Sequence, residues 1–231
     1  MLELFPEGFV EARRGDSVEL AAFTDAAGAD RLRDRFGSVE TEPVASGWED
    51  EWKRFHRPVR IGSLWIGPPW EDAPDGVEAV VIDPGRAFGT GAHPTTRLCV
   101  ELLLELERGS LLDVGCGSGV LAIAASKLGF APVVAIDADE EAVEAATRNA
   151  AANGAEIDVR LLDAATDELP AAEIAVANID LQTLGRLSPP AAWAALVTSG
   201  YYEADRFAFP GFAHVERKAD ACWAADLFRR Q

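Results

Sequence analysis

The clearest chemical signal in the sequence is a glycine-rich stretch in the middle of the chain. Gly115, Gly117 and Gly119 follow the apolar run Leu111–Val114, a pattern typical of a buried strand that turns into a helix. Glycine lets the backbone approach a ligand where a Cβ atom would clash, and the N-terminus of the following helix points at the same place. We therefore predict a ligand site at this turn, although close packing of strand and helix could also explain the glycines.

The spacing of this stretch narrows the class of ligand. It is G-x-G-x-G, whereas a dinucleotide fingerprint is G-x-G-x-x-G, which argues against an NAD-dependent oxidoreductase. Asp113 lies two residues before the first glycine. An acid there meets a pyrophosphate poorly but suits a ligand with an ammonium group, such as S-adenosylmethionine. We therefore list Asp113, Gly115, Gly117 and Gly119 as cofactor-binding candidates.

A second acidic residue ends the next apolar run. Asp137 follows Val133–Ile136, and its carboxylate could accept two hydrogen bonds from a ribose diol, each worth about 1.5–3 kcal/mol. Asp139 is close by, but it precedes the predicted helix Glu140–Asn153 and is better explained as its N-cap.

A loop rich in glycine, proline and threonine, Asp83–Thr96, forms the third candidate. Thr95 or Thr96 could cap the predicted helix Arg97–Leu106, and a hydroxyl at that place could also bind a carboxylate. His93 is a weak candidate for a base.

The fourth candidate is Asn178, which follows the apolar run Ile174–Ala177. An amide there could orient the lone pair of an amine toward an electrophilic methyl group, so that positioning supplies most of the catalysis. Alternatively, Asn178 only holds its loop in place. We name Asn178 as the catalytic candidate.

The elements that must position these residues alternate from about Val77 onward. Apolar runs separated by helical segments predict βαβ units and a mostly parallel, doubly wound sheet. The predicted strands are Leu111–Val114, Val133–Ile136, Val159–Leu162, Ile174–Ala177 and Ala195–Thr198. Val120–Leu128 is a further predicted helix, and Ala213–Lys218 with Ala221–Phe228 predicts an antiparallel C-terminal hairpin.

The N-terminal sequence predicts a small α+β domain over residues 1–45. Its predicted elements are strands at Gly8–Arg13, Ser17–Phe23 and Ser38–Val44 and a helix at Ala27–Phe36. Trp48, Trp52 and Phe55 follow with helical spacing, and we expect residues 46–76 to form an aromatic linker. The large domain is then residues 77–231.

Composition excludes several classes of protein. The 231 residues hold 39 acidic and 21 basic side chains, a net charge of −18, which disfavours direct binding to nucleic acid and attracts a basic partner. No apolar run approaches the roughly 20 residues of a membrane span. Cys99, Cys116 and Cys222 lack paired spacing, so we expect no metal site and a reducing, cytoplasmic location.

The motifs together resemble one family. The segments AFGTGAHPTT, DVGCGSGVLAI, AIDAD and VANI are similar to those of the ribosomal protein L-eleven methyltransferases. These are class I, S-adenosylmethionine-dependent enzymes that methylate lysine side chains and an α-amine of a ribosomal protein. The resemblance implies a Rossmann-like fold, displacement of the methyl group by a protein amine, and cofactor contacts at Thr96, Gly115, Asp137 and Asn178. It also implies that the small N-terminal domain, residues 1–45, recognises the substrate protein.

The C-terminal half departs from this family. The segments Leu187–Ala192 and Tyr201–Pro210 are shorter than the helices and the proline-glycine-glycine turn of the family. The shortening keeps two alternatives open: a class I methyltransferase for another protein or a small amine, or a catalytically silent module that binds the cofactor.

Overall fold

A computed structural model describes residues 10–14, 17–21, 26–37, 39–41, 57–83 and 91–231 of the chain. The chain forms two compact units, Met1–Glu51 and Trp52–Gln231, and each is described by itself.

The first unit contains a β-hairpin and a helix. Strand β1 (Val10–Arg14) pairs antiparallel with β2 (Ser17–Ala21). Helix α1 (Ala26–Phe36) ends where Gly37 takes a left-handed φ of 86° and its N–H donates to the carbonyl of Arg33, a glycine cap. These elements match the predicted ones.

One predicted strand of this unit is not formed where it can be described. Residues 39–41 carry no strand, and the rest of Ser38–Val44 lies outside the described residues, as do Trp48, Trp52 and Phe55. Because Pro43 lacks an N–H, this segment is poorly suited to a sheet.

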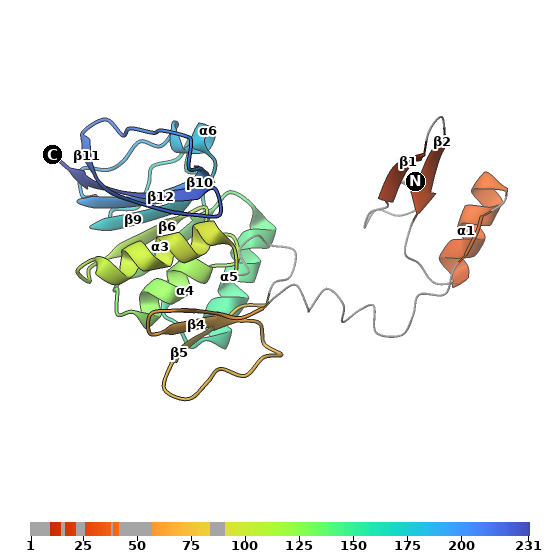
Figure 1. The fold of residues 1–231 in the computed structure, drawn as a ribbon, viewed down its shortest axis with the longest axis horizontal. Helices are drawn as coiled ribbons and strands as arrows, with labels where there is room; N and C mark the ends of the chain where they lie inside the picture. Colours follow the sequence, from red (N-terminus) through yellow and green to blue (C-terminus); the bar gives the residue numbers. More distant parts are fainter. Residues whose placement is uncertain (1–9, 15–16, 22–25, 38, 42–56, 84–90) are drawn as a thin grey trace. The chain divides into compact units, whose positions relative to one another are not determined.

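The second unit is built on a seven-stranded sheet in the order β11-β12-β10-β9-β6-β7-β8 (Figure 1). The strands are β6 (Leu111–Val114), β7 (Val133–Asp137), β8 (Ile157–Leu161), β9 (Ile174–Asn178), β10 (Ala195–Tyr202), β11 (Phe212–Asp220) and β12 (Trp223–Arg230). Strands β6 to β10 pair in parallel, and β12 pairs antiparallel with both β10 and β11. The predicted fold class, a mostly parallel α/β sheet with an antiparallel C-terminal hairpin, is confirmed.

Three helices cover one face of this sheet (Figure 1). They are α3 (Pro94–Glu105), α4 (Val120–Lys127) and α5 (Glu140–Ala152). Every residue of β6 is buried, which explains why its sequence is apolar except for Asp113. Asp139 caps α5 by accepting a hydrogen bond from the N–H of Glu141 at 3.0 Å, as predicted.

The opposite face is covered by short segments. Helix α6 (Leu181–Leu184) is a single turn, and the loop after it buries Leu187 and Trp193 against the sheet. Phe209 does the same from the loop that follows β10. Despite the shortened segments seen in the sequence, the C-terminal half completes the sheet.

A second, three-stranded sheet packs on the far side of the helices. It consists of β3 (Val59–Ile61), β4 (Leu64–Gly67) and β5 (Glu78–Val81). Leu64 and Ile66 are buried in the core that α3 and α4 share. The segment predicted as a linker, residues 46–76, thus contributes two strands to the large unit.

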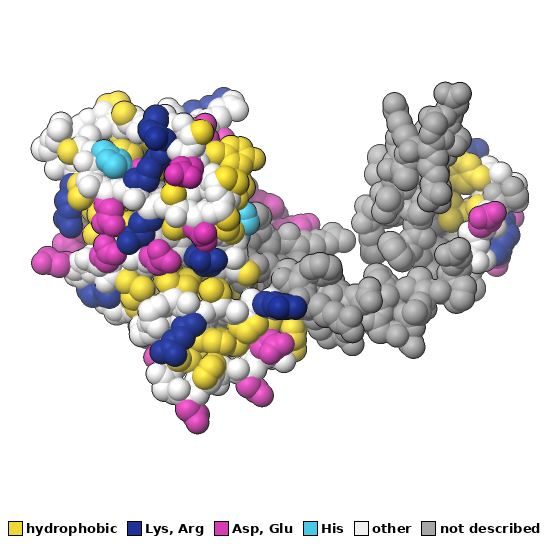
Figure 2. Space-filling model, in the orientation of Figure 1, with side chains coloured by type: hydrophobic (Ala, Val, Ile, Leu, Met, Phe, Trp, Pro, Cys, Tyr) yellow, Lys and Arg dark blue, Asp and Glu magenta, His cyan; other side chains and the backbone are white. Residues whose placement is uncertain are grey.

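Acidic and basic side chains are interspersed on the face shown in Figure 2. Lys218 pairs with Glu105 at 2.8 Å and Glu216 at 3.3 Å, and Arg97 pairs with Asp220 at 2.9 Å. Among the described residues, no helix has the length and apolar character needed to cross a membrane.

Candidate functional site

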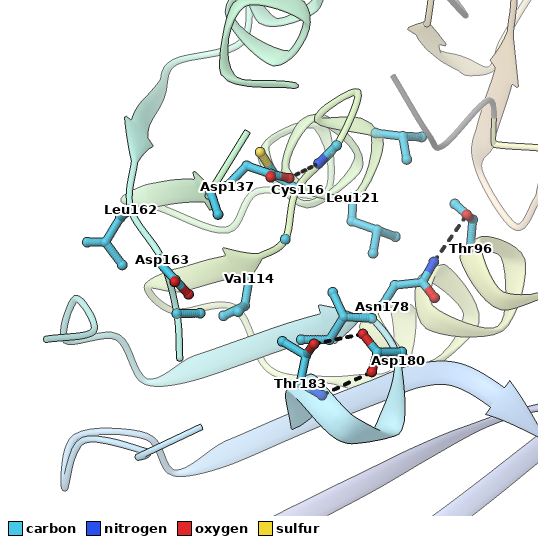
Figure 3. Close-up of a pocket in the computed structure, with 16 residues that line it drawn as sticks. Thr96, Val114, Cys116, Leu121, Asp137, Leu162, Asp163, Asn178, Asp180 and Thr183 are labelled. Carbon is cyan, nitrogen blue, oxygen red and sulfur yellow. Dashed lines mark hydrogen bonds between the residues drawn. The ribbon is translucent and has the colours of Figure 1, made fainter. Parts of the chain in front are cut away.

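A pocket of about 300 Å³ opens at the carboxyl ends of β6 and β9 (Figure 3). The chain runs from β6 outward to β7 and β8 and then returns to β9 on the other side of β6. Such a switch point is where doubly wound sheets bind ligands. The pocket is lined by Thr96, Val114, Gly115, Cys116, Gly117, Val120, Leu121, Asp137, Ala138, Leu162, Asp163, Ala164, Asn178, Ile179, Asp180 and Thr183.

The glycine-rich turn forms one wall of this pocket. The N–H groups of Gly115 and Cys116 both donate to the carbonyl of Ile136, at 2.9 and 3.0 Å. Gly115 has a φ of 70°, and a Cβ atom on it would lie 2.4 Å from Cγ2 of Ile179. A side chain at Gly115 would therefore collide with the pocket wall, and the turn needs glycine here.

Asp137 lies at the end of β7, next to this turn. Its Oδ2 accepts a hydrogen bond from the N–H of Gly117 at 2.8 Å, and its Oδ1 accepts one from the N–H of Asp139 at 3.0 Å. Each carboxylate oxygen can accept a second hydrogen bond. A carboxylate fixed in this way can receive a pair of hydroxyl groups without rearranging.

Asn178 and Thr96 lie side by side at one end of the pocket, as Figure 3 shows. The Nδ2 atom of Asn178 donates to Oγ1 of Thr96 at 3.5 Å, a long contact between β9 and the first turn of α3. Thr96 is fully buried and is one of the residues around the pocket. Among the described residues, the Oδ1 atom of Asn178 accepts no hydrogen bond, which suits an amide that holds a donor group of a ligand.

His93 is the N-cap of α3, the helix that carries Thr96. Its Nδ1 atom accepts a hydrogen bond from the N–H of Thr95 at 3.3 Å and lies 2.7 Å from Oγ1 of Thr95. Helix α3 therefore begins at Pro94, three residues before the predicted start at Arg97. Burial lowers the pKa of His93, so the ring is neutral near pH 7, as a cap that accepts a hydrogen bond must be.

Two predicted cofactor residues, Asp113 and Gly119, lie behind the turn and do not line the pocket. Oδ2 of Asp113 accepts a hydrogen bond from the N–H of Ala122 in α4 at 3.0 Å, and the carboxylate is 1% exposed. Burial raises the pKa of Asp113 to about 7 although the Ala122 N–H opposes the shift. Gly119 begins α4, and a Cβ atom on it would lie 3.0 Å from Cβ of Ala146 in α5.

Three polar pocket residues were not predicted. Asp163 follows β8, and Asp180 and Thr183 lie at the start of α6. Oδ2 of Asp180 accepts a hydrogen bond from the Thr183 hydroxyl at 2.7 Å, and this bond and that of the Thr183 N–H hold the pKa of Asp180 below its usual value. For Asp163, the position directly after the predicted strand Val159–Leu162 was the available signal, because strand ends meet at one edge of a parallel sheet.

Comparisons with known proteins agree on the class that this fold and pocket define. The structure of a ribosomal protein L11 methylase from Lactobacillus delbrueckii subsp. bulgaricus matches with a TM-score of 0.64 and 28% identity, over 76% of this chain and all of that chain. A putative methyltransferase from Escherichia coli matches with a TM-score of 0.53 and 18% identity, which shows the fold alone. The chain is a class I methyltransferase.

The comparisons also identify the family within this class. A family model described as ribosomal protein L11 methyltransferase (PrmA) matches residues 15–204, and the chain belongs to that family. A ribosomal protein L11 methyltransferase from Geotalea uraniireducens is 40% identical over 227 residues, 84% of this chain and 72% of the relative. One from Yersinia pseudotuberculosis is 47% identical over 149 residues, and the chain spans half of its length. The family resemblance inferred from the motifs is confirmed.

Proposed function

We propose that this chain is an S-adenosylmethionine-dependent protein N-methyltransferase that acts on lysine side chains, α-amines or both in ribosomal protein L11. The observation that carries the proposal is that one pocket holds a fixed carboxylate, Asp137, at one end and the amide of Asn178 at the other. Gly115 and Gly117 of the glycine-rich turn line the same pocket.

The residues of the pocket fit the proposed cofactor. Asp137 would accept the two ribose hydroxyls, and Gly115 and Gly117 would let the amino acid part approach the backbone. Thr96, at the start of α3, would bind the carboxylate end. Asp113 and Gly119 would act by shaping the turn, because neither lines the pocket. When bound, S-adenosylmethionine supplies a methyl group activated by its sulfonium.

Cys116 contributes an uncharged thiol to the glycine-rich wall of the pocket. Burial raises the pKa of its thiol well above the usual value, and the neighbouring Asp113 and Asp137 carboxylates raise it further. The thiol therefore stays protonated and does not compete with an amine as a nucleophile.

The acceptor amine would be oriented by Asn178. Its amide oxygen can accept an N–H of a neutral amine and so direct the nitrogen lone pair into the pocket. Asp180 lines the same end of the pocket, but its lowered pKa makes it a weak base. It would attract the protonated amine, which must lose its proton to solvent before the reaction.

The names of the relatives support ribosomal protein L11 as the substrate. A net charge of −18 would attract a basic ribosomal protein. We place this activity in the cytoplasm and expect no direct contact with nucleic acid. The N-terminal residues 1–45 remain our candidate for the region that recognises the substrate.

The proposal is tested in two steps. Titration calorimetry with S-adenosylmethionine and with NAD should give binding of the former alone; binding of NAD, or of neither, would contradict the cofactor assignment. Labelled S-adenosylmethionine added to a cell extract should then label ribosomal protein L11. Label on another protein would favour the alternative acceptor, and binding without any labelling would favour the silent module.

A further inference from the structure

A buried amide in α5 joins the glycine-rich turn to the end of β5. Asn149 is 4% exposed, and its Nδ2 donates to the carbonyl oxygen of Ser118 at 2.9 Å. Its Oδ1 accepts a hydrogen bond from the N–H of Asp83 at 3.2 Å. One side chain therefore binds two segments that are distant in the sequence.

The first of these segments is part of the candidate cofactor site. Ser118 lies between Gly117 and Gly119, both of which have left-handed φ angles, of 53° and 81°. Its carbonyl belongs to the peptide that joins Ser118 to Gly119, so a hydrogen bond to that carbonyl restrains the turn from behind. Ala146, one turn before Asn149, packs against Gly119, and the same face of α5 therefore supports both residues.

The second segment leads toward Thr96. Asp83 follows β5 and is the first residue of the glycine- and threonine-rich loop that ends at α3. An amide is suited to this place because it offers a donor to the Ser118 carbonyl and an acceptor to the Asp83 N–H. A buried carbonyl without a partner would be costly.

We propose that Asn149 is a positioning residue for the cofactor, which sets the glycine-rich turn at the angle that the ligand requires. This proposal rests on the proposed binding of S-adenosylmethionine. Asn149 does not line the pocket and acts through Ser118.

Asn153 provides a matched control on the same helix. Its side chain donates to the carbonyl of Val81 at 2.6 Å and accepts from the Val81 N–H at 2.7 Å. Like Asn149, it offers a donor and an acceptor to backbone groups, but both of these bonds go to β5. Its Nδ2 also donates to the carbonyl of Asn149 at 2.8 Å, and none of its bonds reaches the turn. A purely structural role predicts similar effects for the two residues.

The experiment measures the Kd of S-adenosylhomocysteine by calorimetry, together with the Tm of the ligand-free protein. We expect Asn149→Ala and Asn153→Ala to lower the Tm by similar amounts, while Asn149→Ala alone weakens binding by about tenfold or more. Equal losses of affinity in both variants, or an unchanged Kd in Asn149→Ala, would overturn the proposal. Failure of the wild-type protein to bind would instead refute the proposed function.

A second variant keeps the proposal testable if Asn149→Ala does not fold. In Asn149→Asp, the acid would retain the acceptor for Asp83, and burial would raise its pKa. When protonated it can donate to the Ser118 carbonyl, and when ionised it would repel that oxygen. Affinity relative to wild type should therefore improve as the pH falls from about 8 to about 5.5. A constant ratio over this range would contradict the role of the Ser118 bond.

Discussion

The carboxylate of Asp137 accepts a hydrogen bond from the N–H of Gly117 at 2.8 Å, which joins the end of β7 to the glycine-rich turn after β6. This bond places an acceptor for hydroxyl groups beside a turn whose backbone is open to a ligand. Asp137 ends β7, and Gly117 lies in the turn that follows the neighbouring parallel strand β6, so the sheet brings the two residues together.

The first prediction concerns this carboxylate. Asp137→Ala should weaken cofactor binding by about 2–4 kcal/mol, because charge-assisted hydrogen bonds to the ribose are lost. Calorimetry measures this change. Asp139→Ala is the control: it removes the cap of α5 and should cost about 1 kcal/mol of stability, with little effect on affinity. Equal affinities for Asp137→Ala and wild type would remove Asp137 from the site.

Asn178→Ala should lower the rate of methyl transfer. We expect kcat to fall about 100-fold because the amine loses its orientation, while the Kd of the cofactor and the Tm change far less. Steady-state kinetics with ribosomal protein L11, combined with calorimetry, separate these quantities. A loss of affinity as large as the loss of kcat would assign Asn178 to cofactor binding alone.

The buried carboxyl of Asp113 should make stability depend on pH. Its pKa is about 7 in the folded chain and near 3.9 in an unfolded chain, so between these values the folded state alone binds the proton. Stability therefore falls as the pH rises through this window. Relative to Asp113→Asn, the free energy of unfolding should fall by about 2 kcal/mol between pH 5 and pH 7. Urea unfolding at each pH measures it, and parallel curves for the two proteins would contradict the assignment.

Asp226 should stabilise the C-terminal half. It is 1% exposed and accepts hydrogen bonds from Arg217 at 2.8 and 2.9 Å and from the Tyr201 hydroxyl at 2.7 Å. Arg217 also binds the carbonyls of Glu203 and Asp205, which hold the loop after β10 in place.

Removing this carboxylate leaves a partly buried guanidinium unpaired. Asp226→Ala should therefore lower the free energy of unfolding by about 3 kcal/mol. Asp220→Ala, which breaks the exposed pair with Arg97, should cost less than about 1 kcal/mol. Chemical denaturation compares the two, and similar small losses would show that the network adds little.

The strands that flank the pocket could be predicted from the sequence because they are buried on both faces. β6, β7 and β9 were placed to within a residue, since continuous apolar runs ending at glycine, Asp137 or Asn178 leave little freedom. The strands β3 and β4 could not be predicted, because each has only three or four residues and is too short to show the alternation of apolar and polar side chains. The start of α3 was misplaced because histidine is an unusual helix cap.

The pocket was predictable in part for a related reason. Residues at strand ends, such as Asp137 and Asn178, follow from the strands themselves. The side-chain direction of Asp113 does not, because a strand residue beside a turn can face either the ligand or the helix. Asp163 was missed although the strand before it was predicted, because an acid that follows a largely exposed edge strand is as readily a solvated surface residue as a pocket residue.

The measurement that tests the central claim most directly is transfer of labelled methyl groups from S-adenosylmethionine to purified ribosomal protein L11. We predict labelling that increases from about pH 7 to about pH 9, as amines with unperturbed pKa values of about 7.7–8.0 and 10.4 lose their protons. Salt should raise KM more than it lowers kcat, because it screens the attraction between the acidic enzyme and a basic substrate. A protein that binds S-adenosylmethionine yet leaves ribosomal protein L11 unlabelled over this whole pH range would contradict the account.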